Sequence, residues 1–279
     1  MFKSRLRTSY ILTIIIAILA MIASAGGLFI DGLYRDNALI TSAWHGNDFV
    51  TLVIVLPLMV TSLILAMRGS QKAQLVWIGT LGYMLYNYIF YLYGAAFNRF
   101  FLIYVLLFTL SMYALVFAMT KIDAMAVSQA FRVVTPVKWI SGFMMFFAVF
   151  LGVLWIAMSL SFVFTGQVPQ PILQTDHPTG VVFATDLSLL IPALILGSTL
   201  LWKRLPWGFV LASIVLIKAS TYGLAMIAMS VFTYVELGTV DSLLPLWVVL
   251  SLGCFISCGL LLGNMKSLPF HLALSKDGK

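Results

Sequence analysis

The stretch WGFVLASIVLIKASTYGLAMIAMSVF, residues 207–232, decides how this chain folds. It is long enough to cross a bilayer, because about 20 apolar residues in a helix span the hydrocarbon core. Lys218, near its middle, is its only charged residue. A charge at that depth is costly in lipid, so the lysine is expected to face protein or water. The stretch therefore predicts a membrane helix that carries a buried polar site.

The composition of the whole chain is typical of a membrane protein. Of its 279 residues, 62% are hydrophobic and only 9% are charged, and the mean hydropathy is +1.07. Soluble domains carry roughly 25% charged residues, which excludes a soluble protein. The net charge of +7 is weak evidence for nucleic-acid binding, since Lys and Arg of membrane proteins gather in cytoplasmic loops. The expected partner is the lipid bilayer, and no nucleic acid.

Eight apolar stretches predict an all-α polytopic membrane protein with a single transmembrane domain over 1–279. The predicted spans are 10–30, 49–67, 73–97, 100–120, 139–164, 181–202, 207–234 and 243–265. The first is interpreted as a retained helix, because its apolar run exceeds the roughly 7 to 15 residues of a signal sequence.

The distribution of charge predicts the orientation of these spans. With a cytoplasmic N-terminus, every Lys and Arg except Arg35, Arg99 and Lys218 falls in a cytoplasmic segment, as the positive-inside rule requires. Both termini are therefore predicted to be cytoplasmic, in a multi-pass protein of the cell inner (plasma) membrane. The segments 31–48 and 165–180 become the largest outer loops, and the three prolines of the second favour irregular structure. The cytoplasmic connection 121–138 has room for one turn or a short helix.

The two halves of the chain, 1–120 and 138–266, show a parallel order of features. Each has an outer His, an Asp, a Pro within a helix, a short basic turn and a polar residue at the centre of the following helix. The residues concerned are His45, Asp48, Pro57 and Asn87 in the first half and His177, Asp186, Pro192 and Lys218 in the second. A parallel 4+4 internal repeat would place polar sites where the halves meet. The alternative is that any eight-helix protein with short basic inner turns shows this order.

Asp186 is the obvious partner for Lys218, since buried charges are usually paired. It lies about five residues into the sixth predicted span, within roughly 10 Å of the outer boundary, whereas Lys218 lies near the midplane. Helical side chains lean toward their own N-terminus, which sends these two in opposite directions. Two hypotheses remain open: a direct ion pair, or a water or ligand between the two charges.

Three further residues are candidates for the same site. Asn87 lies among tyrosines in the third span, and a buried amide needs hydrogen bonds, so it is a candidate partner for Lys218 or a ligand; a helix-packing contact is the alternative. Tyr86 and Tyr222 are candidates to orient a small or amphiphilic ligand.

The outer segments contain weak candidates for a metal site. His45, Asp48 and His177 have suitable side chains, but they are equally well explained as interfacial residues in contact with water. Cys254 and Cys258 are interpreted as packing residues. No HExxH, P-loop or GxSxG pattern occurs, so an enzyme is less favoured, and no cofactor is assigned.

Three stretches carry a resemblance: LGYMLYNYIFYLYGAAFN at 81–98, ATDLSLLIP at 184–192 and LPWGFVLASIVLIKASTYGLAMIAMS at 205–230. They resemble uncharacterised bacterial polytopic inner-membrane proteins. The resemblance implies a bacterial origin and brings no activity with it.

The leading hypothesis is a binding or transport protein. In it, the second, third, sixth and seventh spans enclose a polar cavity with Lys218 as its fixed positive charge and Asp186 as the balancing or proton-exchanging group. The alternative is a non-catalytic accessory or structural subunit of a membrane complex, with a protein partner or as a homo-oligomer. An intramembrane enzyme acting on lipid or quinone has the least support.

Overall fold

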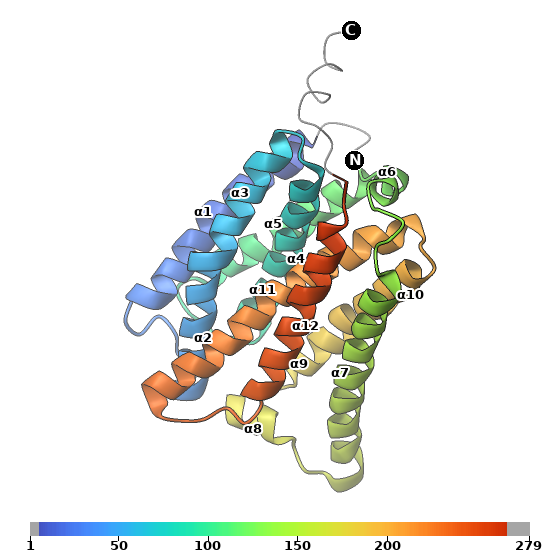
Figure 1. Ribbon diagram of the computed structural model, residues 1–279. Helices are drawn as coiled ribbons and strands as arrows, with labels where there is room; N and C mark the ends of the chain where they lie inside the picture. Colours follow the sequence, from blue (N-terminus) through green and yellow to red (C-terminus); the bar gives the residue numbers. More distant parts are fainter. Residues whose placement is uncertain (1–5, 267–279) are drawn as a thin grey trace.

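The computed structural model describes residues 6–266, and every regular element within that range is a helix (Figure 1). Eight helices are long and apolar enough to cross a membrane, which confirms the predicted number of spans. Six of them are continuous α-helices, including the central α11. They are α1 (Arg7–Phe29), α4 (Gln71–Tyr93), α5 (Phe101–Thr120), α7 (Val137–Thr165), α11 (Pro206–Leu237) and α12 (Leu244–Gly263).

The other two spans contain a turn of π-helix in the middle. The second span consists of α2 (Ala38–Val50), η1 (Thr51–Val55) and α3 (Leu56–Met67). The sixth consists of α9 (Val181–Thr185), η2 (Asp186–Leu190) and α10 (Ile191–Trp202). In both, the second residue after the π-turn is a proline, Pro57 or Pro192. Proline lacks the N–H and its ring crowds the preceding turn, and a wider π-turn is a known way to relieve this within a continuous helix.

The second span begins much earlier than the sequence predicted. Residues 38–48 were expected to belong to an outer loop, but α2 starts at Ala38, where the side chain of Asn37 caps the helix by accepting a hydrogen bond from the N–H of Ile40 at 2.9 Å. The prediction was wrong because the polar residues His45, Asn47 and Asp48 interrupt the apolar pattern of this part of the helix. Its polar groups face other helices: Asn47 and Asp48 are each only 2% exposed.

The two longer connections each contain a short helix. The connection 121–138 holds α6 (Ala124–Gln129), in agreement with the expected short helix. The connection 166–180 holds α8 (Gln170–Thr175), where irregular chain was expected. The prolines expected to prevent a helix lie at its start, at Pro169 and Pro171, where proline is well tolerated because the first N–H groups need no intrahelical partner.

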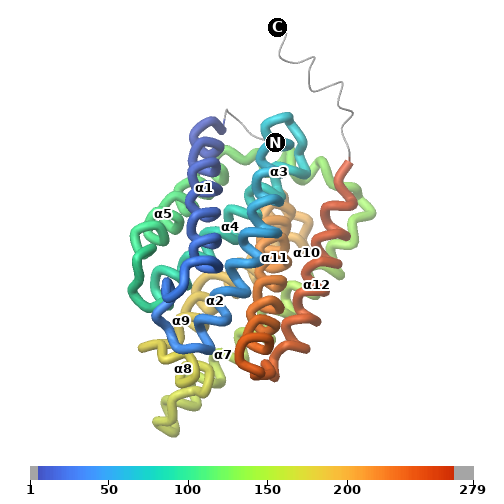
Figure 2. The backbone as a smooth tube through the Cα atoms, turned by 90° about the vertical axis from the view of Figure 1, so that its left-hand side faces the viewer, coloured from blue at the N-terminus to red at the C-terminus, as the bar shows by residue number. Residues whose placement is uncertain are grey.

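The helices α4 and α11 form the centre of the bundle (Figure 2). In the most apolar 18-residue stretch of each helix, 72% of the residues of α4 and 67% of those of α11 are buried, against 28% in α5 and in α12. Helix α11 packs against α2, α4, α10 and α12. The outward faces of the peripheral helices carry exposed apolar side chains, such as Leu102 and Val153, as contact with a lipid bilayer requires.

The two ends of the bundle differ in charge. We call them the α6 end, where α1 begins, and the α8 end, where α1 stops and α2 starts (Figure 1). Within residues 6–266, all Lys and Arg except Arg35, Arg99 and Lys218 lie in segments at the α6 end. The predicted cytoplasmic location of that end remains a prediction.

One backbone pattern occurs twice, 135 residues apart. The π-turns at 51–55 and 186–190 share this spacing, and so do the reversals that follow α3 and α10. In those reversals the N–H of Arg68 bonds to the carbonyl of Ile64 at 3.2 Å, and the N–H of Lys203 bonds to that of Thr199 at 3.3 Å. The next residue has positive φ in both copies, 90° at Gly69 and 54° at Arg204. At this spacing Thr51 corresponds to Asp186 and Tyr83 to Lys218.

Candidate functional site

Lys218 lies at the middle of α11 with 6% of its surface exposed. Its Nζ atom sits 3.0 Å from the centroid of the Tyr86 ring and 4.7 Å from that of Tyr222. It makes no hydrogen bond or ion pair with any of residues 6–266. Aromatic faces attract a cation by their quadrupole, but they leave the ammonium N–H groups without acceptors. The lysine is thus held in place and remains open to a ligand.

Asp186 does not pair with Lys218, because their charged atoms lie farther apart than 4.0 Å. The Tyr86 hydroxyl donates to Oδ1 of Asp186, and the indole Nε1–H of Trp155 donates to Oδ2 at 2.8 Å. Both carboxyl oxygens therefore have protein donors. Tyr86 bridges the two charged residues, with its hydroxyl on Asp186 and its ring under Lys218. The direct ion pair is therefore absent, and a water or ligand between the two charges remains a prediction.

Aromatic packing fixes the position of Tyr86. Its ring packs edge-to-face with Tyr222 at a centroid distance of 4.9 Å and with Phe90, one turn along α4, at 5.1 Å. Phe90 in turn stacks on Tyr222 at 5.9 Å. Trp155 stacks on Phe183 at 4.3 Å, which orients its indole toward Asp186. The donors to Asp186 are held by rings on four helices, so the carboxyl has little freedom to turn toward Lys218.

A cavity of about 260 Å³ extends from Lys218 toward the α8 end. The four spans expected to enclose it all contribute, and so do α7 and α12. Its walls are mostly apolar and include the indole rings of Trp44, Trp155 and Trp247. Ser251 adds a buried hydroxyl oxygen without a hydrogen-bond partner. The cavity combines the ammonium of Lys218, the carboxyl of Asp186, the unpaired hydroxyl of Ser251 and aromatic walls.

The segment 166–180 lines the cavity at its α8 end, where we place the mouth. Ile172, Thr175 and His177 line the cavity there. The amide of Asn37 donates to the carbonyl of Gln174 at 2.9 Å, which ties α8 to the start of α2. Partial burial lowers the pKa of His177 below its ordinary value. A neutral histidine with an unpaired Nε2 therefore sits at the mouth.

Asn87 belongs to a different cluster. Its Oδ1 accepts a hydrogen bond from Nδ2 of Asn47 at 2.8 Å, and Nδ2 of Asn47 also lies 3.0 Å from the Tyr91 hydroxyl. Asn87 does not line the cavity around Lys218. Tyr86 and Asn87 are neighbours in sequence, but a helix turns by 100° per residue, so they face different sides of α4.

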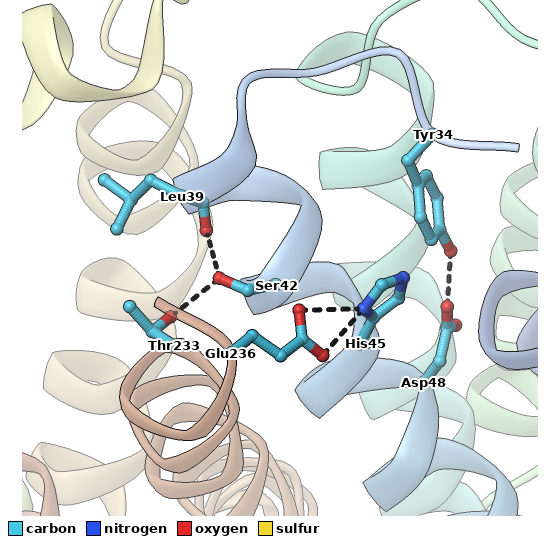
Figure 3. Close-up of polar contacts among 7 residues, drawn as sticks. All are labelled: Tyr34, Leu39, Ser42, His45, Asp48, Thr233 and Glu236. Atoms are coloured by element: carbon cyan, nitrogen blue, oxygen red, sulfur yellow. Dashed lines mark hydrogen bonds and ion pairs between the residues drawn. The ribbon is translucent and has the colours of Figure 1, made fainter. Parts of the chain in front are cut away.

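The three weak metal candidates do not converge. His45 contacts Glu236 of α11 at 2.9 Å, and Asp48 accepts a hydrogen bond from the Tyr34 hydroxyl (Figure 3). His177 lies at the mouth of the cavity. Among residues 6–266, no three His, Cys, Asp or Glu side chains are grouped as metal ligands. Asp48 was interpreted as interfacial, and that was wrong, because it is 2% exposed.

Sequence reasoning missed Trp155, Trp247 and Ser251. Trp155 lies in the predicted fifth span, and its depth was a usable signal, because a buried indole N–H needs an acceptor. Trp247 and Ser251 are one turn apart on α12, but nothing in the sequence indicates that this face of α12 turns toward α11.

Comparison with known proteins identifies no relative: no family model, no curated protein and no solved structure matches this chain.

Proposed function

We propose that this protein binds a small or amphiphilic molecule with an anionic head group in the cavity around Lys218, as a binding or transport protein. The unpaired ammonium of Lys218, buried and facing a cavity, is the observation that carries the proposal. A buried charge without a partner is costly, and an anionic ligand would compensate it. Of the candidate residues, Lys218 binds the head group, Tyr86 and Tyr222 orient it, and Asp186 positions Tyr86.

The walls of the cavity suit the apolar part of such a ligand. Tryptophan and aliphatic side chains surround the space between Lys218 and the α8 end, and ligand sites are commonly apolar with few well-placed polar groups. The volume of about 260 Å³ favours a small acid or the head and first carbons of a lipid-like acid. Placement in a bacterial inner membrane, with the α6 end cytoplasmic, is part of the proposal, and it would make the α8 end the outer mouth.

Binding of laurate to the purified protein tests this proposal. Laurate supplies a carboxylate and an apolar chain, and the cavity tryptophans supply a native fluorescence signal. We expect laurate to change this fluorescence saturably and Lys218→Met to weaken binding about tenfold or more, since a hydrogen bond to a charged group contributes about 1.5–3 kcal/mol. Dodecyltrimethylammonium, with the same chain and the opposite charge, is the control, and its binding should not weaken in Lys218→Met.

Equal affinity of wild type and Lys218→Met for laurate would contradict the proposal. Native mass spectrometry of protein purified from its own membranes separates the remaining alternative. A bound small acid that is lost in Lys218→Met supports the ligand site, whereas a stoichiometric protein partner without a bound small molecule supports the accessory subunit.

A further inference from the structure

A second buried carboxyl lies outside the cavity, at Asp48 of α2. Both of its oxygens accept hydrogen bonds from phenols: Tyr34 donates to Oδ2 (Figure 3), and Tyr91 of α4 donates to Oδ1 at 3.0 Å. Phenol hydroxyls are neutral donors. They orient a carboxyl but do not balance its charge.

No cation faces Asp48. Of the elements around it, α1 contributes Ser24 and no titratable group, α5 contributes Tyr104, and α4 contributes Tyr83, Tyr88 and Tyr91. The nearby loop contributes Tyr34 and, farther off, Asp36. On α2 itself, His45 is one turn away and is paired with Glu236 of α11 (Figure 3). No Lys or Arg among residues 6–266 takes part in this cluster.

Unpaired hydroxyls surround the same carboxyl. Ser24 is fully buried and lies beside both Asp48 and Tyr88. The hydroxyl oxygens of Ser24, Tyr88 and Tyr104 are all buried and have no hydrogen-bond partner. A buried polar atom without a partner calls for an explanation, and a proton on Asp48 or a metal ion bound to it would each supply one.

The packing around Asp48 decides between these. Gly27 of α1 lies so close that a Cβ in its place would collide with Oδ2 of Asp48 and with the Tyr34 hydroxyl. Metal ions such as Na⁺ or Ca²⁺ need several oxygen ligands around a free centre, but here one carboxyl oxygen is enclosed by α1 and Tyr34. A proton needs no such space, and Ser24 Oγ supplies an acceptor for it.

We propose that Asp48 is a proton-binding site, in which the carboxylic acid donates its proton to Ser24 Oγ and accepts hydrogen bonds from Tyr34 and Tyr91. On release, the acid O–H turns from Ser24 Oγ to the Tyr34 oxygen, and Tyr34 passes its own proton to water at the α8 end as it takes the proton of Asp48. The new O–H of Tyr34 then turns back to Asp48. The carboxylate that remains accepts hydrogen bonds from Tyr34, Tyr91 and Ser24. The site is independent of the ligand proposed for Lys218.

The position of the site suggests what proton exchange would affect. The ring of Tyr91 packs on Trp44 at a centroid distance of 4.5 Å, and Trp44 lines the cavity. Helix α4 therefore presents Tyr91 to the proton site and Tyr86 to Lys218. A change in charge at Asp48 acts on the same helix pair, α2 and α4, that forms one wall of the cavity.

Infrared spectroscopy of the full chain in lipid nanodiscs tests the proton site. With carboxyl-¹³C aspartate incorporated by cell-free synthesis, a protonated aspartic acid gives a label-sensitive C=O band, which a carboxylate lacks. At pH 7 we expect this band in the wild type and in Asp186→Asn, and its loss in Asp48→Asn. Asp48→Glu keeps a carboxyl, but the glutamate carries no label, so the C=O band should move to the unlabelled frequency in this variant. This variant keeps the test valid if Asp48→Asn does not fold.

The path through Tyr34 has its own readout. On transfer to D₂O the band should shift at least tenfold more slowly in Tyr34→Phe than in the wild type, and Tyr104→Phe is the matched control with the wild-type rate. The absence of a label-sensitive band in the wild type, or its persistence in Asp48→Asn, would overturn the proposal. So would a rise in thermal stability in NaCl over choline chloride that Asp48→Asn abolishes, because that result assigns a metal ion to the site.

Discussion

The side chain of Tyr86 connects the two charges that stand out in the sequence. Its hydroxyl donates a hydrogen bond to Asp186, and its ring lies against the ammonium of Lys218. One side chain therefore contacts both charged residues. This leaves the ammonium without a hydrogen-bond acceptor, while both oxygens of the carboxyl have donors. A direct ion pair would have satisfied both charges and left no cation for a ligand.

Tyr86→Phe separates these two roles. The ring over Lys218 remains, but Asp186 loses one of its two donors, and an unsatisfied buried acceptor costs about 1–3 kcal/mol. We expect the free energy of unfolding to fall by that amount in SDS titrations of the protein in mixed micelles. Tyr88→Phe, on the same helix, removes a buried hydroxyl without a partner, so it should leave the stability unchanged or raise it, because an unsatisfied buried polar group is itself costly. Equal losses in the two variants would contradict the bridging role.

His177 predicts a dependence of stability on pH at the cavity mouth. Burial lowers its pKa in the folded protein from the ordinary 6.5, so the unfolded chain binds the proton more readily. The stability from neutral His177 is therefore complete above about pH 6.5 and is lost as the pH falls through the lower, folded-state pKa. Thermal unfolding followed from pH 7.5 to pH 5 should show a smaller decrease in His177→Gln than in the wild type. A parallel decrease in both would remove His177 as the cause.

At the scale of elements, the close contact between α2 and α11 holds the two candidate sites together. Hydroxyls of Ser42 and Thr233 lie 3.1 Å apart across it, and His45 pairs with Glu236 one turn further along (Figure 3). Gly46 makes this approach possible, because a Cβ in its place would lie 2.6 Å from the backbone of Ala228. Small residues commonly allow membrane helices to pack this closely.

Gly46→Ala tests this contact. The added methyl group meets backbone atoms, which cannot move aside as a side chain can, and overpacking costs about 1–3 kcal/mol. Gly142→Ala is the control: it lies in the interior of α7 with no atom within 4 Å of its Cβ position, and alanine there is expected to be neutral or to stabilise by up to about 1 kcal/mol. SDS unfolding of both variants measures the difference, and a neutral Gly46→Ala would show that α2 and α11 separate at little cost.

For the whole molecule, the uneven charge of the two ends predicts how it sits in the membrane. Positive residues favour the cytoplasmic side, so the α6 end is expected inside and the α8 end outside. Val134 at the α6 end and Val240 at the α8 end are 76% and 71% exposed, and both suit a single introduced cysteine.

Labelling of these positions checks the orientation. In a Cys254→Ser, Cys258→Ser background, a membrane-impermeant thiol reagent added to intact spheroplasts should label Val240→Cys and not Val134→Cys. Opening the membrane should make both accessible. The reverse pattern would place the α6 end outside and would assign the cavity mouth to the cytoplasm.

The repeated backbone pattern also belongs to this scale. Its spacing of 135 residues pairs Thr51 and Tyr83, whose hydroxyls lie 2.8 Å apart, with Asp186 and Lys218. Two neutral residues in one half thus correspond to two charged residues in the other. The internal duplication remains a prediction, and on this spacing Tyr83, not Asn87, is the counterpart of Lys218.

The sequence by itself determined the eight long apolar helices and the position of a buried charge at Lys218, and it singled out Asp186 as a second one. These follow from local composition, because the bilayer penalises every exposed charge and rewards every long apolar run whatever the rest of the chain does. The start of α2 escaped prediction for the same reason: polar residues interrupt the apolar pattern of 38–48, and only their contacts with α1, α4 and α11 make burial acceptable.

Only the tertiary structure decided which polar groups meet. Tyr86 and Asn87 are adjacent and similar in depth, yet the turn of the helix directs Tyr86 toward Lys218 and Asn87 toward Asn47. Asp48 and Asp186 are both carboxyls near the same end, yet Tyr34 and α1 enclose the first and Trp155 and Tyr86 hold the second. Partner choice depends on how helices rotate and approach one another, and that is set by packing over the whole bundle.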